Sequence, residues 1–108
     1  MHSTLIVARI AAGADAEVAQ RFGDFDRSDM PHRMGTRRRQ PFTHKGLYFH
    51  LQDFDDATGG ERIEAAKTDP RFVRISDDLK PFIEAYDPAT WRSPADAVAT
   101  RFYDWSAR

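Results

Sequence analysis

Near the start of the chain the hydrophobic positions change their period. Residues 4–10 form a short, β-branched run, and Gly13 follows soon after its end. Such a run predicts a strand that is buried on both faces for most of its length. From Asp15 onwards, apolar residues recur at positions i, i+4 and i+7 between polar ones, namely Val18, Phe22 and Phe25. This spacing predicts an amphipathic helix that ends near residues 27–29, because the residue before Pro31 disfavours helical geometry.

Two extended runs occupy the middle of the chain, at residues 32–42 and 46–54, and residues 41–45 suit a hairpin connection between them. Side chains of the second run alternate between two faces. One face carries Leu47, Phe49 and Leu51, and the other carries Tyr48, His50 and Gln52. If the first face meets another sheet, alternation directs the second face towards the helices.

The second half of the chain predicts another helical region followed by a strand. Acidic side chains at residues 55–56 favour the positive end of a helix dipole and suit a helix start. The helical pattern is interrupted around residues 68–70 and then resumes as an apolar stripe as far as about Ile83. Residues 86–94 are predicted to be a loop, and residues 97–105 a last strand.

The predicted elements follow the order strand, helix, strand, strand, helix, strand (βαββαβ). Over 108 residues this order indicates a single α+β domain spanning residues 1–108. The expected architecture is a ferredoxin-like sandwich with one four-stranded antiparallel sheet and both helices on one face. The uncovered sheet face carries many apolar residues. Burial against a second copy would remove that face from water, so we expect a homodimer.

Composition excludes several classes of function. The 16 basic and 17 acidic residues nearly cancel to a net charge of −1, which argues against a nucleic-acid partner. The absence of cysteine excludes disulfides, thiolate nucleophiles and cysteine-based metal sites. The four histidines lack the spacings of zinc sites, and there is no glycine-rich phosphate loop. With no apolar run long enough to span a bilayer and no signal sequence, we expect a soluble, cytoplasmic protein that needs neither metal nor cofactor.

Three places could carry chemistry. In the arginine triplet at residues 37–39, alternation puts Arg37 and Arg39 on one face, where a guanidinium could hold an enolate or a carboxylate. The neighbouring Arg38 points the other way and suits a solvated face. His50 has the side chain whose ordinary pKa suits acid–base work near neutrality. Asp26 stands at the C-terminal turn of the first helix, where the helix dipole does not stabilise a carboxylate.

Four segments together resemble a known family. They are Pro31-x-x-Met34-Gly35-Thr36-Arg37-Arg38-Arg39, Leu47-Tyr48-Phe49-His50-Leu51, Asp69-Pro70-Arg71-Phe72 and Arg101-Phe102-Tyr103-Asp104-Trp105. This pattern resembles the small polyketide cyclases of the tetracenomycin F2 cyclase type over nearly the whole chain. The resemblance implies a ferredoxin-like, dimeric α/β barrel that works without a cofactor. The implied reaction is a late intramolecular aldol condensation and dehydration that closes a ring in an aromatic (type II) polyketide.

The resemblance also implies site residues, in a pocket between the sheet and the helices. The family's candidate catalytic groups match Asp26, Arg39 and His50. We expect His50 to be the general acid and base, Arg39 to hold the developing oxyanion, and Asp26 to orient or deprotonate the substrate. The residues assigned to substrate binding are Tyr48, Arg37, Phe25 and Met34, with Tyr48 as a reserve donor beside His50.

The chain departs from the family pattern at two positions. Phe25 stands where the family commonly has a histidine, and Asp69-Pro70 stands where relatives carry His-Pro. These differences can mark a different substrate or a different ring closure. The sequence leaves open whether the substrate arrives free or on an acyl carrier protein.

Two other classes of function stay open at this point. A cofactor-free monooxygenase that oxidises polyketide anthrones shares the dimeric α/β barrel, and oxygen uptake would separate it from a cyclase. A non-catalytic dimeric module would have a closed pocket in which His50 is packed and satisfied. RNA binding through the arginine triplet is disfavoured, because few aromatic side chains lie beside it.

Overall fold

The computed structural model describes residues 2–55, 59–92 and 94–107. Its elements in chain order are β1 (His2–Ile10), α1 (Asp15–Asp26), α2 (Met30–Met34), β2 (Thr36–His44), β3 (Leu47–Phe54), α3 (Gly59–Ala66), α4 (Pro70–Leu79), β4 (Ile83–Ala85) and the 3-10 helix η1 (Pro94–Ala97). None of the described helices is long and apolar enough to cross a membrane.

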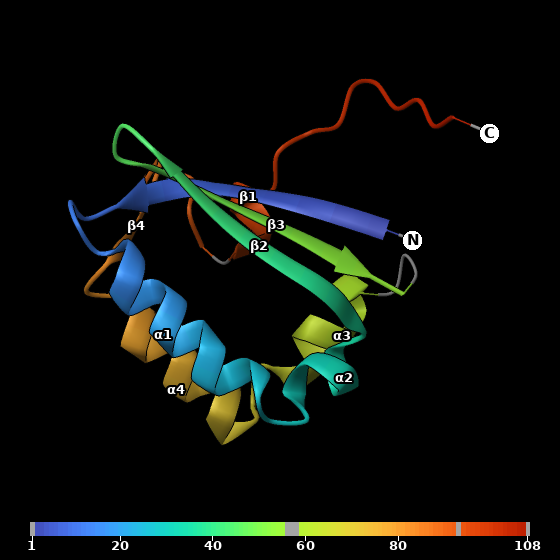
Figure 1. The fold of residues 1–108 in the computed structure, drawn as a ribbon, viewed down its shortest axis with the longest axis horizontal. Coiled ribbons are helices and arrows are strands. Elements are labelled where there is room, and N and C mark those ends of the chain that lie inside the picture. The colour runs from blue at the N-terminus through green and yellow to red at the C-terminus, as the bar shows by residue number, and fades with distance from the viewer. Residues whose placement is uncertain (1, 56–58, 93, 108) are drawn as a thin grey trace.

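The four strands form one antiparallel sheet in the order β2-β3-β1-β4. All four α-helices lie on the same side of this sheet (Figure 1). The α+β, ferredoxin-like sandwich predicted from the element order is therefore confirmed. In this order β1 is a central strand, because it lies between β3 and β4 and pairs with both.

Strand β3 shows the predicted alternation along its whole length. Tyr48, His50 and Gln52 are between 4% and 7% exposed and face the helices, whereas Leu47, Phe49 and Leu51 on the opposite face are only partly buried. The helix-facing side of the sheet therefore carries the core. The buried residues of that core cluster include Ala8, Val18, Phe22, Phe25, Met30, Met34, Tyr48, Ala66 and Ile75.

The segment around Pro31 differs from the prediction. Residues 32–34 were expected to begin an extended run but belong to α2, whose first turn contains Pro31. Proline suits the first turn of a helix, because its missing N–H would have no partner there. Gly35 then ends the helix with a φ of 73°, a left-handed conformation that favours glycine.

The hairpin connection is also shorter than predicted. Strand β2 continues to His44, so the connection is made by Lys45 and Gly46, whose φ angles are 50° and 81°. A two-residue hairpin turn whose twist matches that of its strands requires a positive φ at both of its central residues.

The C-terminal region departs most from the prediction. Helix α4 ends at Leu79, and Ile83–Ala85 form the fourth strand, although residues up to Ile83 were predicted to be helical. The strand predicted at residues 97–105 is wrong: η1 covers its start, and only Val98 makes an isolated bridge to Ile6. The rest of this segment runs away from the sheet (Figure 1), and its alternating residues have no strand beside them.

The helical start predicted at residues 55–56 is not observed at Asp55, which follows β3 as a bend, and Asp56 lies outside the described residues. Helix α3 begins at Gly59, and the predicted interruption at residues 68–70 is confirmed between α3 and α4. Asp69 caps α4 by accepting a hydrogen bond from the Arg71 backbone N–H at 2.8 Å.

The first prediction compares two glycines, one at the C-terminal end of α2 and one inside α1. Gly35→Ala should lower the free energy of unfolding by about 1–2 kcal/mol, because alanine is disfavoured at positive φ, and its Cβ would also meet the Arg62 guanidinium. Gly23 lies inside α1, and a Cβ added there would have nothing within 4 Å. Gly23→Ala should therefore stabilise the protein by about 0.5–1 kcal/mol, because glycine inside a helix is less favourable than alanine. Urea denaturation measures both values. Equal effects of the two substitutions would contradict the assigned backbone conformations.

Candidate active site

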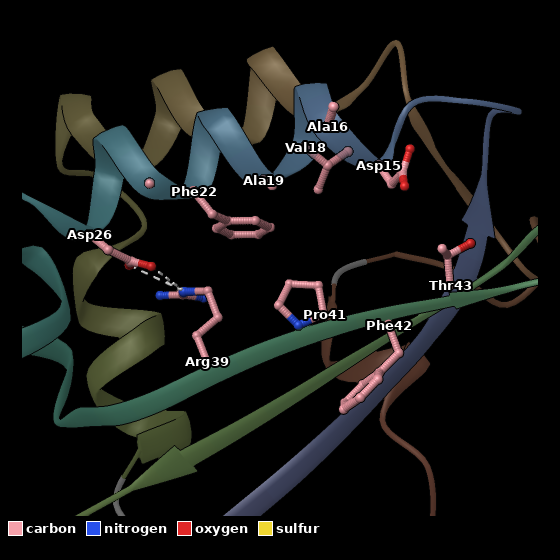
Figure 2. A pocket seen from close by; sticks show the side chains of 11 residues that line it. Asp15, Ala16, Val18, Ala19, Phe22, Asp26, Arg39, Pro41, Phe42 and Thr43 are labelled. Atoms are coloured by element: carbon pink, nitrogen blue, oxygen red, sulfur yellow. Dashed lines mark hydrogen bonds and ion pairs between the residues drawn. The ribbon is translucent and has the colours of Figure 1, made fainter.

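Three polar side chains from three elements meet on the helix-facing side of the sheet. Arg39 on β2 donates from Nε to Asp26 at the end of α1, with distances of 3.2 Å to Oδ1 and 3.0 Å to Oδ2 (Figure 2). The Nη1 atom of Arg39 lies 3.1 Å from Nε2 of His50 on β3. The predicted meeting of Asp26, Arg39 and His50 on one side of the sheet is therefore observed.

Strand pairing explains why Arg39 and His50 are neighbours. In the β2–β3 ladder Arg39 pairs with Gln52, and Pro41 pairs with His50, so Arg39 lies diagonally across from His50. Residues opposite or diagonal in a ladder share one face of the sheet. Because His50 and Gln52 point to the helices, the Arg39 side chain does so as well.

Arg37 does not accompany Arg39 into the site. The strand register shifts between Thr36 and Arg38, so simple alternation does not run through Arg37. The Arg37 side chain is 63% exposed and forms an ion pair with Asp55, with 3.3 Å between Nη1 and Oδ1. The prediction that Arg37 and Arg39 share a face is therefore wrong, and the cause is the bulge, whereas the expectation that at least one of them points inward holds for Arg39.

Arg39 is a buried cation, and one of its nitrogen atoms has no hydrogen-bond partner among the described residues. Its side chain is 8% exposed, and its guanidinium carbon lies 4.7 Å from the ring centre of Phe22 and 5.7 Å from that of Phe25. Within the described residues, its Nη2 atom is buried and has no hydrogen-bond partner. A buried donor without a partner is unfavourable, and an oxygen atom of a bound molecule would relieve that cost.

His50 is a neutral acceptor in this arrangement. Burial, followed by the nearby charge of Arg39, lowers the pKa of His50 to about 3. Because arginine can only donate, Nε2 of His50 accepts the hydrogen bond from Arg39, which assigns the imidazole proton to Nδ1. The Phe22 and Tyr48 rings pack beside His50, with centre-to-centre distances of 5.1 and 6.0 Å.

Two of the predicted substrate-binding residues are part of the core around this site. Tyr48 is 4% exposed, and burial raises the pKa of its hydroxyl above its ordinary value. Met34 is 4% exposed and belongs to the core cluster. Neither side chain is among the lining residues of the two described cavities, so in this structure both belong to the core.

A cavity of about 530 Å³ lies between α1 and β2, with Arg39 and Asp26 at one end (Figure 2). Its lining residues are Asp15, Ala16, Val18, Ala19, Phe22, Gly23, Asp26, Arg39, Pro41, Phe42 and Thr43. His50 lies behind Arg39 and is not among these lining residues, which the sequence interpretation did not foresee. Phe25 lines a separate cavity of about 300 Å³ near α4, and its ring lies 5.7 Å from the guanidinium carbon of Arg39.

Several cavity residues were missed by the sequence interpretation. Phe22 was assigned only to a helix, and Pro41 and Thr43 only to the hairpin connection. A usable signal was present, because Phe22 and Asp26 are four residues apart on the same helix face. Within the described residues, no group of three or more histidine or acidic side chains could hold a metal ion.

Comparison with known proteins gives consistent results. The sequence model of the polyketide synthesis cyclase family matches residues 2–106. The polyketide synthase CurG of Streptomyces cyaneus is 39% identical over 105 residues, covering 97% of each chain. Tetracenomycin F2 cyclase of Streptomyces glaucescens is 35% identical over 95 residues, covering 87% of this chain and 85% of its own.

Solved structures extend this comparison. The structure of tetracenomycin F2 cyclase, described as a type-II polyketide cyclase, superposes over 100% of both chains with a TM-score of 0.92 and 30% identity. An antibiotic biosynthesis monooxygenase from Chloroflexus aurantiacus matches with a TM-score of 0.56 and 15% identity, over 77% of this chain and 81% of its own. The latter likeness concerns the fold alone.

The second prediction tests the buried, neutral state of His50. An unfolded histidine titrates near pH 6.5, whereas the folded pKa is about 3. The unfolded state therefore binds the proton first, so the stability linked to His50 is present above pH 6.5 and is lost as the pH falls towards 3. The free energy of unfolding of the wild type should fall more steeply over this range than that of His50→Gln.

Urea denaturation at several pH values measures this difference, and the imidazole NMR signals report the titration of His50 directly. His44→Gln is the matched control, because His44 is exposed at the end of β2. If the free energy of unfolding varies with pH in the same way for the wild type and His50→Gln, and His50 titrates near pH 6.5, then His50 is not the buried, neutral histidine described above.

Proposed function

The chain belongs to the polyketide synthesis cyclase family and is a ring-closing enzyme, and we propose that Arg39, Asp26 and His50 form its catalytic group. The proposed reaction is a late intramolecular aldol condensation and dehydration of an aromatic (type II) polyketide, without a cofactor. The observation that carries this proposal is the Nη2 atom of Arg39, which is buried and has no hydrogen-bond partner among the described residues, in a side chain that lines the cavity beside the Asp26 carboxylate.

Arg39 and Asp26 supply the two functions that an aldol closure requires. Asp26 accepts a proton from a methylene between two carbonyl groups, and Nη2 of Arg39 donates a hydrogen bond to the enolate oxygen that forms. The enolate carbon then attacks a second carbonyl of the same chain. This attack closes the ring, and Asp26 returns its proton to the new alkoxide. In the dehydration Asp26 takes the second proton from the same carbon and gives it to the departing hydroxyl, so that water leaves and a carbon–carbon double bond forms. Arg39 remains charged throughout, because a guanidinium does not deprotonate in proteins.

His50 has a different role from the one expected of a general acid and base. Its imidazole is neutral, and its Nε2 already accepts a hydrogen bond from Arg39. Since His50 holds Nη1 and Asp26 holds Nε, the orientation of the guanidinium is fixed and Nη2 is left for the substrate. We therefore assign His50 as a positioning residue that acts through Arg39.

The cavity walls supply the remaining part of catalysis. A poly-β-keto chain cyclises readily without help, so an enzyme must select one folded geometry and exclude water. Phe22, Ala19 and Pro41 give this cavity an apolar middle section against which such a chain can pack. Selection of one ring closure then depends on shape, and the rate depends on Arg39 and Asp26.

The third prediction concerns Arg39. Arg39→Lys keeps the charge but loses the planar fork, so kcat should fall by about 10²–10³-fold, as for loss of an oxyanion donor. Arg38→Lys is the matched control and should leave activity unchanged, because Arg38 is exposed. Ring closure of an aromatic polyketide intermediate is followed by absorbance and product analysis. Full activity of both Arg39→Lys and Asp26→Asn would leave cavity shape as the sole catalyst.

The same assay separates the proposed cyclase from a monooxygenase. Under argon and in the presence of a chelator, a cofactor-free cyclase retains its rate. A monooxygenase has no activity under argon, and in air it consumes oxygen as it forms product. Free and carrier-loaded substrates distinguish the two modes of delivery, since an acyl carrier protein partner stays a prediction from the family resemblance. The cytoplasmic location also stays a prediction.

We further propose that the protein is a homodimer in which the uncovered sheet faces are buried. On that face Leu5 pairs with Leu51 and Val7 pairs with Phe49, and all four are only partly buried. In the C-terminal segment, Phe102 is 97% exposed and Trp105 is 72% exposed. Apolar surface of this extent on a 12.4 kDa chain favours burial against a second copy.

The fourth prediction tests this dimer. Sedimentation at micromolar concentration should give a species of about twice 12.4 kDa. Phe49→Asp should shift the equilibrium to the monomer, because it places a charge within the apolar sheet face. Val73→Asp is the matched control on α4, where Val73 is 45% exposed on the helical side. A 12.4 kDa wild-type species alone would refute the dimer.

A further inference from the structure

The cavity between α1 and β2 is bounded on the helix side by one continuous stripe of residues. Their spacing is i, i+4, i+7 and i+11, which places them on one face of a helix. In order they are Asp15, Ala19, Phe22 and Asp26. The stripe therefore begins and ends with a carboxylate and is apolar between them.

Strand β2 presents a matching stripe to the same cavity. Arg39, Pro41 and Thr43 are alternate residues, and they pair with Gln52, His50 and Tyr48, which face the helices. In Figure 2, Arg39 lies opposite Asp26, and the Thr43 side chain points towards the end of α1 that carries Asp15. The strand stripe is thus polar at both ends and apolar in its middle, like the helix stripe, and the polar ends of the two stripes face each other (Figure 2).

The dimensions of the two stripes agree. Eleven residues separate Asp15 from Asp26, about 16 Å along the helix axis at a rise of 1.5 Å per residue. Four residues separate Arg39 from Thr43, about 13 Å at the rise of a strand. The cavity is therefore an elongated slot whose second polar end lies far from the catalytic group.

The second polar end has free hydrogen-bonding capacity. Across the described parts of the chain, no hydrogen bond or ion pair engages the Asp15 carboxylate or the Thr43 hydroxyl, and both residues are exposed within the slot. Asp15 also lies in the first turn of α1, where an acidic side chain is favourable, but Glu17 shares that function. The placement of Asp15 opposite Thr43 calls for a further explanation.

We propose that Asp15 and Thr43 form a distal subsite that binds a phenolic or enolic hydroxyl at the far end of an elongated, planar polyketide. Asp15 accepts the hydroxyl proton, and the Thr43 hydroxyl donates to the same oxygen. The reacting ring then lies at Arg39 and Asp26, and the apolar rings lie along Ala19, Phe22 and Pro41. This inference rests on the proposed function, and it adds that the distal subsite sets which end of the substrate reaches Arg39.

The fifth prediction uses two ligands that differ by one hydroxyl. One is 2,6-dihydroxyanthraquinone, with a hydroxyl at each end of its long axis, and the other is 2-hydroxyanthraquinone. The wild type should bind the dihydroxy compound about three- to tenfold more tightly, the gain expected from one hydrogen bond. Thr43→Val and Asp15→Ala should each remove this preference, with dissociation constants measured by titration calorimetry.

Matched controls separate the subsite from general effects. Thr43→Ser keeps the hydroxyl, and Glu17→Ala removes an acid from the same helical turn without touching the slot, so both should retain the preference. Arg39→Lys should weaken both ligands and keep their ratio. Circular dichroism checks that each variant is folded.

The outcomes distinguish this inference from the proposed function. Equal binding of the two ligands by the wild type, or a preference that survives in Thr43→Val and Asp15→Ala, overturns the distal subsite. If Arg39→Lys still weakens both ligands, the proposed function survives that result. Failure of the wild type to bind either ligand overturns the slot as an aromatic binding site and removes the support for both proposals.

Discussion

The structure of the site depends on the burial of one positive charge. The Arg39 side chain is 8% exposed, and a cation this deep requires compensation from its surroundings. That compensation comes from three groups on two elements: the carboxylate of Asp26 and the ring of Phe22 on α1, and the imidazole of His50 on β3. The guanidinium thereby fixes the distance between helix and sheet. Because Nε is bonded to Asp26 and Nη1 to His50, the plane of the guanidinium is fixed, and the direction of the unpartnered Nη2 is fixed with it.

The charge of Arg39 also explains why the protonation state of His50 cannot be predicted from the residue type alone. A histidine on a strand has an ordinary pKa near neutrality, but here burial and Arg39 hold the pKa at about 3. Protonation would place two cations 3.1 Å apart in a buried site. We therefore proposed the acid–base role for Asp26, whose side chain is 36% exposed at the cavity end. The chemistry of each residue is set by contacts between elements that are distant in the sequence.

This division also shows what the sequence could and could not predict. The alternation of β3 and the apolar spacing of α1 are regular over whole elements, so the face of His50 and the extent of α1 could be predicted from the sequence, whereas Asp26 was assigned to the site by the family resemblance. The bulge at Thr36 and Arg38 interrupts the period of β2 and has no periodic signal, which is why Arg37 was placed wrongly. β4 has three residues, too few to establish alternation. Residues 97–105 alternate but have no pairing strand, and alternation without a partner does not make a strand.

The register of β3 determines which of its residues lie on each of the two faces of the sheet. His50 points to the helices while its neighbours Phe49 and Leu51 point to the opposite face, where the proposed dimer would bury them. A slip of one residue would exchange these faces and place the imidazole outside and phenylalanine beside Arg39. Burial of the outer face in a dimer would add free energy against such a slip, since each apolar side chain would then have to leave an interface. On this argument, association and catalysis are coupled through one strand: the apolar residues that favour a second copy also hold His50 behind Arg39.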